Sequence, residues 1–154
     1  MKGFTLIELV VTVTIVGILA MALLPLGQLS VKRMKEAELR AALRDIRTAL
    51  DAYKKAADEG RVEKAAETAG YPASLDVLAQ GIPDARDPKK RLVRFLRRIP
   101  RDPMNPDTSA TPQETWGKRS YESGQDSPQA GDNVFDVYSL SREIGLNGVA
   151  YNEW

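Results

Sequence analysis

The first part of the chain is almost wholly apolar. Seventeen of the 23 residues from Phe4 to Leu26 are apolar, and the 18 residues from Leu9 to Leu26 carry no charge. Eighteen residues are close to the shortest length that a membrane-spanning helix needs, roughly 17–25 residues. This pattern predicts a helix that lies in a membrane or in an equally apolar assembly.

Beyond this run the apolar residues recur with the period of a helix, at steps of four and three, in Leu39, Leu43, Ile46, Leu50 and Tyr53. Charged residues fill the opposite face. The spacing predicts an amphipathic helix from about Gln28 to Asp58, with Gly60 marking its end. If residues 4–58 form one interrupted helix, it measures roughly 80 Å at 1.5 Å per residue.

The rest of the chain, after residue 60, shows the pattern of short elements. Ser74 and Gly81 are expected to start and stop a short helix. A helix-spaced apolar face is expected at Leu92, Phe95, Leu96 and Ile99. Residues 119–123 and 134–140 favour β-strands, and the Gly/Asp/Ser/Pro-rich loop 124–132 joins them.

We therefore expect an α+β fold. A long N-terminal helix packs, in its second half, against a small antiparallel β-sheet head, because two strands alone are only marginally stable. Four aromatic residues are expected in the core rather than in ligand sites: Tyr121, Phe135, Tyr138 and Trp154.

Composition excludes several classes of site. The chain has 154 residues and contains neither cysteine nor histidine. A disulfide framework, a cysteine zinc site and a Ser-His-Asp triad are therefore impossible. The 22 basic and 21 acidic residues give a net charge of +1, so no global field attracts nucleic acid. We do not expect an enzyme.

Basic residues nevertheless crowd the stretch from 89 to 101, at Lys89, Lys90, Arg91, Arg94, Arg97, Arg98 and Arg101. Nucleic-acid binding would favour interleaved aromatic rings for base stacking, and the stretch offers Phe95 alone. We favour a solvated outer face. A docking surface for a neighbouring subunit or for a secreted protein is the intermediate alternative.

Three interpretations of the N-terminus compete. A cleaved secretory signal is supported by Lys2 and by the A-x-A-like sequence 20–22, but Glu8 falls inside its apolar region. A plain anchor explains the length but not this carboxylate, which costs roughly 2.5–3.5 kcal/mol at the centre of a membrane. Glu8 could instead reach the membrane surface. In the third interpretation, the helix lies first in lipid and later in a protein assembly.

The sequence Gly3-Phe4-Thr5-Leu6-Ile7-Glu8 resembles the processing motif of type IV prepilins and of type II secretion pseudopilins. The resemblance implies that a prepilin peptidase cuts between Gly3 and Phe4 and methylates the new amino group of Phe4. Gly17 and Pro25 match the family's helix glycine and proline, and Pro25 is expected to kink or open the helix. Pro25 equally suits the end of the span.

An assembly role for Glu8 follows from this resemblance. The carboxylate of Glu8 can pair with the Phe4 amine of a neighbouring copy, which neutralises two charges that are each costly in an apolar bundle. A helix shifted along the bundle would leave both charges unpaired. The pair would therefore fix the register of the assembly.

Parts of the head resemble the major, G-type pseudopilin: Tyr71-Pro72, residues 99–103 and Trp116-Gly117. That family usually binds calcium in an Asp-rich C-terminal loop. Residues 139–154 contain no aspartate, so Glu143 and Asn147 are the weak candidate ligands, and calcium is the one cofactor left open. The alternative is a glycine-shaped turn held by Tyr151 and Trp154.

The resulting expectation is a leader (1–3), an assembly helix (4–26), an amphipathic helix (27–60) and a head (61–154). The chain would be a structural subunit of a type II secretion pseudopilus, with itself, other pseudopilins, the assembly platform and the prepilin peptidase as partners. The alternative is a surface type IV pilin or a minor pilin-like module that binds DNA or a ligand; surface pilins usually carry a disulfide.

The resemblance places the helix in the inner membrane and the head in the periplasm. One observation disagrees, because Lys32, Arg33 and Lys35 follow the apolar run and the positive-inside rule would then keep the head in the cytoplasm. Glu36 and Glu38 dilute this cluster. We favour the motif over the charge count.

Overall fold

The structure is a computed structural model that describes residue 3 and residues 5–64, 68–124 and 126–154, without the side chains of residues 22–26. It divides into two compact units, Met1–Lys35 and Glu36–Trp154. Phe4, half of the predicted cleavage site, lies outside the described residues. The predicted boundaries at residues 3, 26 and 60 stay predictions.

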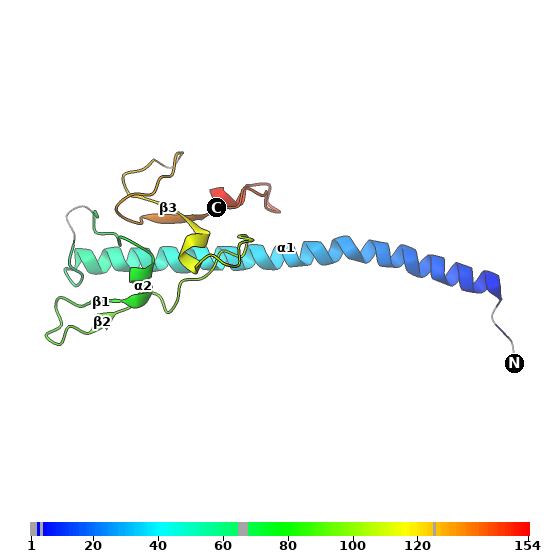
Figure 1. Ribbon diagram of the computed structural model, residues 1–154, viewed down its shortest axis with the longest axis horizontal. Helices are drawn as coiled ribbons and strands as arrows, with labels where there is room; N and C mark the ends of the chain where they lie inside the picture. Colours follow the sequence, from blue (N-terminus) through cyan, green and yellow to red (C-terminus); the bar gives the residue numbers. More distant parts are fainter. Residues whose placement is uncertain (1–2, 4, 65–67, 125) are drawn as a thin grey trace. The chain divides into compact units, whose positions relative to one another are not determined.

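Helix α1, Leu6–Asp58, contributes to both units (Figure 1). The helix ends at Asp58, where the sequence predicted the end of the amphipathic helix. Gly60 follows with a left-handed φ of 69° that favours glycine. The helix is assigned without interruption through Gly17 and Pro25. The kink predicted at these two residues stays a prediction.

The core of the second unit is built on one face of α1. Leu39, Ile46 and Leu50 are at most 1% exposed, as the helical spacing of the apolar residues predicts. They belong to one apolar cluster with residues from distant parts of the sequence, which include Leu75, Leu78, Trp116, Val137 and Tyr151. Removing this area from water drives the packing of the head, at about 25 cal/mol per Å².

Two antiparallel pairs of strands flank the helix. Strand β1 (Ile82–Pro83) pairs with β2 (Leu92–Val93), and β3 (Trp116–Arg119) pairs with β4 (Asp136–Ser139). The β1–β2 hairpin and β3 lie on opposite sides of α1 in Figure 1. A short helix α2 (Asp76–Gln80) and two 3₁₀ turns, η1 (Pro112–Thr115) and η2 (Tyr151–Glu153), complete the head. The predicted α+β fold is confirmed.

Three local predictions are wrong. The strand expected at 119–123 lies earlier, at Trp116–Arg119, because the chain turns at residues 120–123. Residue 75, not Ser74, precedes α2. Residues 92–99 form no helix, because Leu92 belongs to β2 and the N–H groups of Phe95 and Leu96 both donate to the carbonyl oxygen of Leu78.

The aromatic core also differs from the prediction. Tyr121 is 57% exposed, whereas Phe135, Tyr138 and Trp154 are half-buried. Tyr121 stacks at a ring-centroid distance of 5.6 Å on Tyr71, so it covers the core from outside. Among the described residues, the buried aromatic side chains are instead those of Tyr53, Tyr71, Trp116 and Tyr151.

Candidate assembly site

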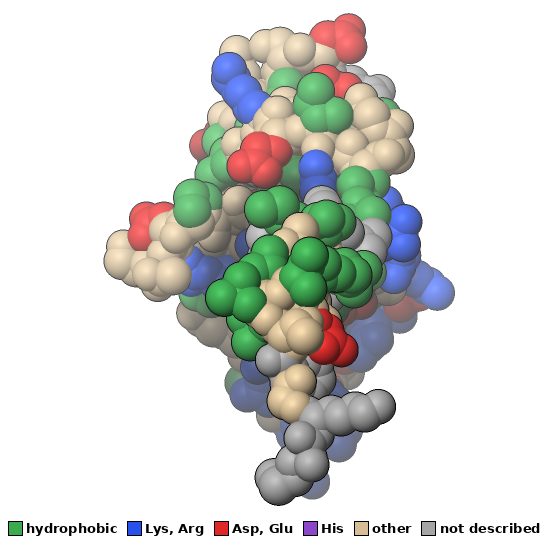
Figure 2. Space-filling model, turned by 90° about the vertical axis from the view of Figure 1, so that its right-hand side faces the viewer, with side chains coloured by type: hydrophobic (Ala, Val, Ile, Leu, Met, Phe, Trp, Pro, Cys, Tyr) green, Lys and Arg blue, Asp and Glu red, His purple; other side chains and the backbone are tan. Residues whose placement is uncertain are grey.

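The N-terminal part of α1 presents an apolar surface. Its large apolar side chains between Leu6 and Met21 are 50–83% exposed. Figure 2 shows apolar side chains gathered over these turns of the helix. Exposed apolar area of this extent marks a surface that lipid or protein covers.

The polar groups of this segment are almost all satisfied within the helix. Thr12 and Thr14 donate their hydroxyl hydrogens to the carbonyl oxygens of Leu9 and Val10, at 2.9 and 2.7 Å. Such internal bonds suit an apolar surrounding, where an unpaired hydroxyl is costly. The threonines therefore do not interrupt the apolar surface.

Glu8 is the exception. Its backbone N–H donates to the Thr5 hydroxyl, 3.4 Å away, at the start of α1. In the part of the chain that the structure describes, its carboxylate forms no ion pair. Of the two residues at the predicted cleavage site, Gly3 is described and exposed, whereas Phe4 lies outside the described residues. The pairing predicted between Glu8 and the Phe4 amine therefore stays a prediction. Within the described ranges, no helix is sufficiently long and apolar to cross a membrane.

A second carboxylate on α1 fixes the C-terminal segment of the head. The Glu36 side chain is 3% exposed, and its Oε1 accepts hydrogen bonds from the Leu146 N–H at 2.7 Å and from the Tyr151 hydroxyl at 3.0 Å. Its Oε2 lies 3.4 Å from Arg40. Burial, followed by the hydrogen bond to Glu36, raises the pKa of Tyr151 to about 12.

We did not predict this role of Glu36 from the sequence. A signal was present, because Glu36 lies three residues before Leu39 and so continues the apolar stripe of α1. A carboxylate on a buried helical face needs a hydrogen-bonding partner.

Asp102, in the segment 99–103, is a buried carboxylate of the head. It is 1% exposed, and its carboxylate accepts hydrogen bonds from the Ser139 hydroxyl at 2.6 Å and from the Met104 N–H at 2.8 Å. The Trp116 indole N–H donates to the Pro100 carbonyl, 2.8 Å away. The polar stretch from Met104 to Thr115 thus brings Trp116 back into contact with Pro100.

Glu143 and Asn147, the candidate calcium ligands, accept hydrogen bonds from backbone N–H groups of the C-terminal segment. The Glu143 carbonyl accepts the Tyr151 N–H at 3.0 Å, and Asn147 Oδ1 accepts the Val149 N–H at 3.1 Å. Tyr151 and Trp154 pack edge to face at 5.1 Å. Among the residues described, no group of three or more carboxylates is placed to hold a metal ion. The side chains of Glu143 and Asn147 supply oxygen ligands, but fewer than the six to eight that calcium takes.

The comparisons with known proteins bear on the N-terminal segment. No curated protein and no solved structure shows significant similarity to the chain. Residues 1–24 match the family model of the prokaryotic N-terminal methylation motif, which includes Gly3, Phe4 and Glu8. This motif is typical of type IV pilin-like proteins, and it supports processing of the chain by a prepilin peptidase.

Proposed function

We propose that this chain is a structural subunit of a type II secretion pseudopilus. A prepilin peptidase cuts between Gly3 and Phe4 and methylates the new amine. The processed chain waits in the inner membrane, with its head in the periplasm. It then polymerises through its N-terminal helix, and the growing filament drives protein export. Its role is mechanical and not enzymatic.

One observation carries this proposal. The methylation motif at residues 1–24 includes helical turns whose large apolar side chains, between Leu6 and Met21, are 50–83% exposed. Glu8 is the only charged residue in the sequence from Leu6 to Leu26. An apolar surface with one carboxylate near its start favours an assembly in which a cation of a neighbouring copy meets that carboxylate.

The choice of a secretion pseudopilus over a surface pilin rests on the head. The chain lacks the cysteines of a C-terminal disulfide. The contact of Trp116 with Pro100 joins two of the segments that resemble the major pseudopilin. The other subunits and the assembly platform are its proposed partners.

Glu8→Ala tests the assembly role. We expect this variant to insert and to be cleaved like the wild type, because Glu8 lies beyond the cleavage site, but to form no filaments in cells that assemble the wild type. Glu38→Ala is the matched control, since Glu38 is an exposed carboxylate on the same helix outside the apolar surface. Normal filaments from Glu8→Ala would contradict the proposed pairing.

A further inference from the structure

Charge is distributed very unevenly over the head. Seven basic side chains and one acidic side chain lie between Arg86 and Arg98, so this basic segment has a net charge of +6. Residues 120–154 contain six acidic side chains and one basic side chain, a net charge of −5. These two opposite excesses nearly cancel in the net charge of +1 of the whole chain.

Most of the basic segment is available to a partner. Arg91 is engaged with Asp87 at 2.5 Å. The other side chains considered are exposed and form no ion pair within the described ranges: Lys89, Lys90, Arg94, Arg97 and Arg98. An uncompensated cluster of five cations attracts an acidic surface and is repelled by its own kind.

Residues 120–154, the acidic region, also contain carboxylates that are available to a partner. Asp136 is engaged by Arg47 at 2.8 Å and by Arg119 at 3.3 Å. Asp126, Asp132 and Glu153 are exposed and, among the residues that the structure describes, form no ion pair. We call these three carboxylates the acidic surface.

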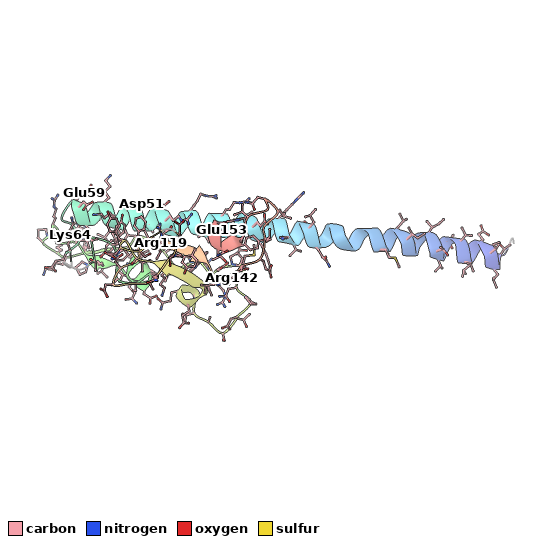
Figure 3. All side chains as sticks on the ribbon, turned by 90° about the horizontal axis from the view of Figure 1, so that it is seen from above. Asp51, Glu59, Lys64, Arg119, Arg142 and Glu153 are labelled. Atoms are coloured by element: carbon pink, nitrogen blue, oxygen red, sulfur yellow. The ribbon has the colours of Figure 1, made fainter. Side chains whose placement is uncertain are left out.

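Two of the three carboxylates of the acidic surface line a cavity. Asp126 and Glu153 line a cavity of about 560 Å³ together with Arg47, Arg119 and Asp136. Figure 3 labels Arg119 and Glu153, which reach it from β3 and η2. Two arginines and three carboxylates line the cavity, so its side chains carry a net charge of −1. A lysine or arginine side chain suits such a recess.

The two charged surfaces cannot meet within one copy. The β1–β2 hairpin, which carries the start of the basic segment, lies on one side of α1, and the loop after β3 lies on the other side (Figure 1). We propose that the basic segment of one copy docks against the acidic surface of a second copy. Such a head-to-tail contact uses two different surfaces and can extend indefinitely. This inference rests on the proposed function, which requires a polymer.

A second copy fits the basic segment better than nucleic acid does. Phe95 is the one aromatic residue of the segment, and its ring packs edge to face on Tyr53, at 5.4 Å. It is therefore not free to stack on a base, which is how sequence-tolerant binding to single strands gains much of its energy. The acidic surface, by contrast, is present at the same concentration as the basic segment in every assembly.

A charge swap in the full-length protein tests the contact. Arg97→Glu with Arg98→Glu, and separately Asp126→Lys with Asp132→Lys, should each lower the amount of filament about tenfold, because like charges then face each other. The chain with all four changes should recover filament to within about twofold of the wild type. Lys35→Glu with Lys55→Glu, an equal charge change at exposed positions elsewhere, is the control and should assemble normally.

Cross-linking gives a second readout, because the natural chain has no cysteine. A chain with both Arg97→Cys and Asp126→Cys should form a ladder of disulfide-linked multimers, whereas Arg97→Cys alone has no thiol opposite it in this contact and should form no ladder. No ladder, or normal filament from both reversed pairs, would overturn the docking contact while wild-type filaments keep the proposed function intact. If the wild type itself forms no filament, the proposed function fails instead.

Discussion

Glu36 and Tyr151 lie 115 positions apart in the sequence, yet the Tyr151 hydroxyl donates to Glu36 Oε1 over 3.0 Å in the interior of the head. The same oxygen accepts the N–H of Leu146 at 2.7 Å. One carboxylate of α1 thus holds two points of the C-terminal segment. A second polar link between the helix and the end of the chain comes from Arg47, which donates to the Trp154 carbonyl oxygen at 2.8 Å.

Removing the Glu36 carboxylate should destabilise the head. Glu36→Ala removes the carboxylate that accepts hydrogen bonds from the Tyr151 hydroxyl and from the Leu146 N–H, and we expect a loss of about 2–4 kcal/mol in the free energy of unfolding. Denaturant unfolding of the purified protein measures this loss. Glu38→Ala, which removes an exposed carboxylate two residues away, should change the free energy by less than about 0.5 kcal/mol. Equal effects would contradict the assignment.

The same pair predicts a pH dependence. The pKa of the Tyr151 hydroxyl is raised from 10.0 to about 12 in the folded state, first by burial and then by its bond to Glu36. Between these values the unfolded chain loses this proton and the folded chain keeps it. The stabilising contribution is therefore complete below pH 10 and is lost as the pH rises to about 12.

Comparison with Tyr151→Phe isolates this contribution. Burial also raises the pKa of Tyr53 and Tyr71, so the wild type should lose stability at high pH for more than one reason. In denaturant unfolding, Tyr151→Phe should lose less stability than the wild type over the same range. An identical decline in both proteins would show that Tyr151 titrates normally.

Gly117 should not tolerate a side chain. It pairs with Tyr138 across β3 and β4, and a Cβ atom at this position would collide with the Tyr138 ring. We expect Gly117→Ala to cost about 1–3 kcal/mol, as overpacking does. Thermal unfolding measures the cost. Gly124→Ala is the matched control, because nothing lies within 4 Å of the Cβ that it would introduce.

The long-period patterns were predictable from the sequence. Leu39, Ile46 and Leu50 recur at the helical spacing and form the buried face of α1, because one stripe of a helix must pack on the core. The run 134–140 contains β4 for a similar reason, since its β-branched and aromatic residues favour extended backbone. These features depend on neighbours that are close in the sequence.

The features that depend on distant partners were not predictable. Residues 119–123 favour a strand, yet the Tyr121 N–H bonds to the Asn133 side chain, 2.9 Å away, and the chain turns there. The apolar spacing of residues 92–99 resembles that of a helix, but the Leu78 carbonyl draws the N–H groups of Phe95 and Leu96. Tertiary hydrogen bonds outweigh local propensity at both places.

The candidate assembly site, in contrast, could be predicted from the sequence. Gly3, Phe4 and Glu8 were recognised from the sequence, because the motif lies within a few consecutive residues and matches a family model over residues 1–24. Their function depends on a peptidase and on neighbouring copies, which act on the chain from outside. A single folded copy therefore leaves Glu8 exposed, with its carboxylate not engaged in any ion pair that the described residues form.

Intact-mass analysis of the protein extracted from membranes tests the central claim most directly. Our account predicts a chain that has lost Met1 to Gly3 and gained one methyl group on the amine of Phe4. A chain that still begins at Met1, or one cut after the A-x-A-like sequence so that it begins at Leu23, would contradict it.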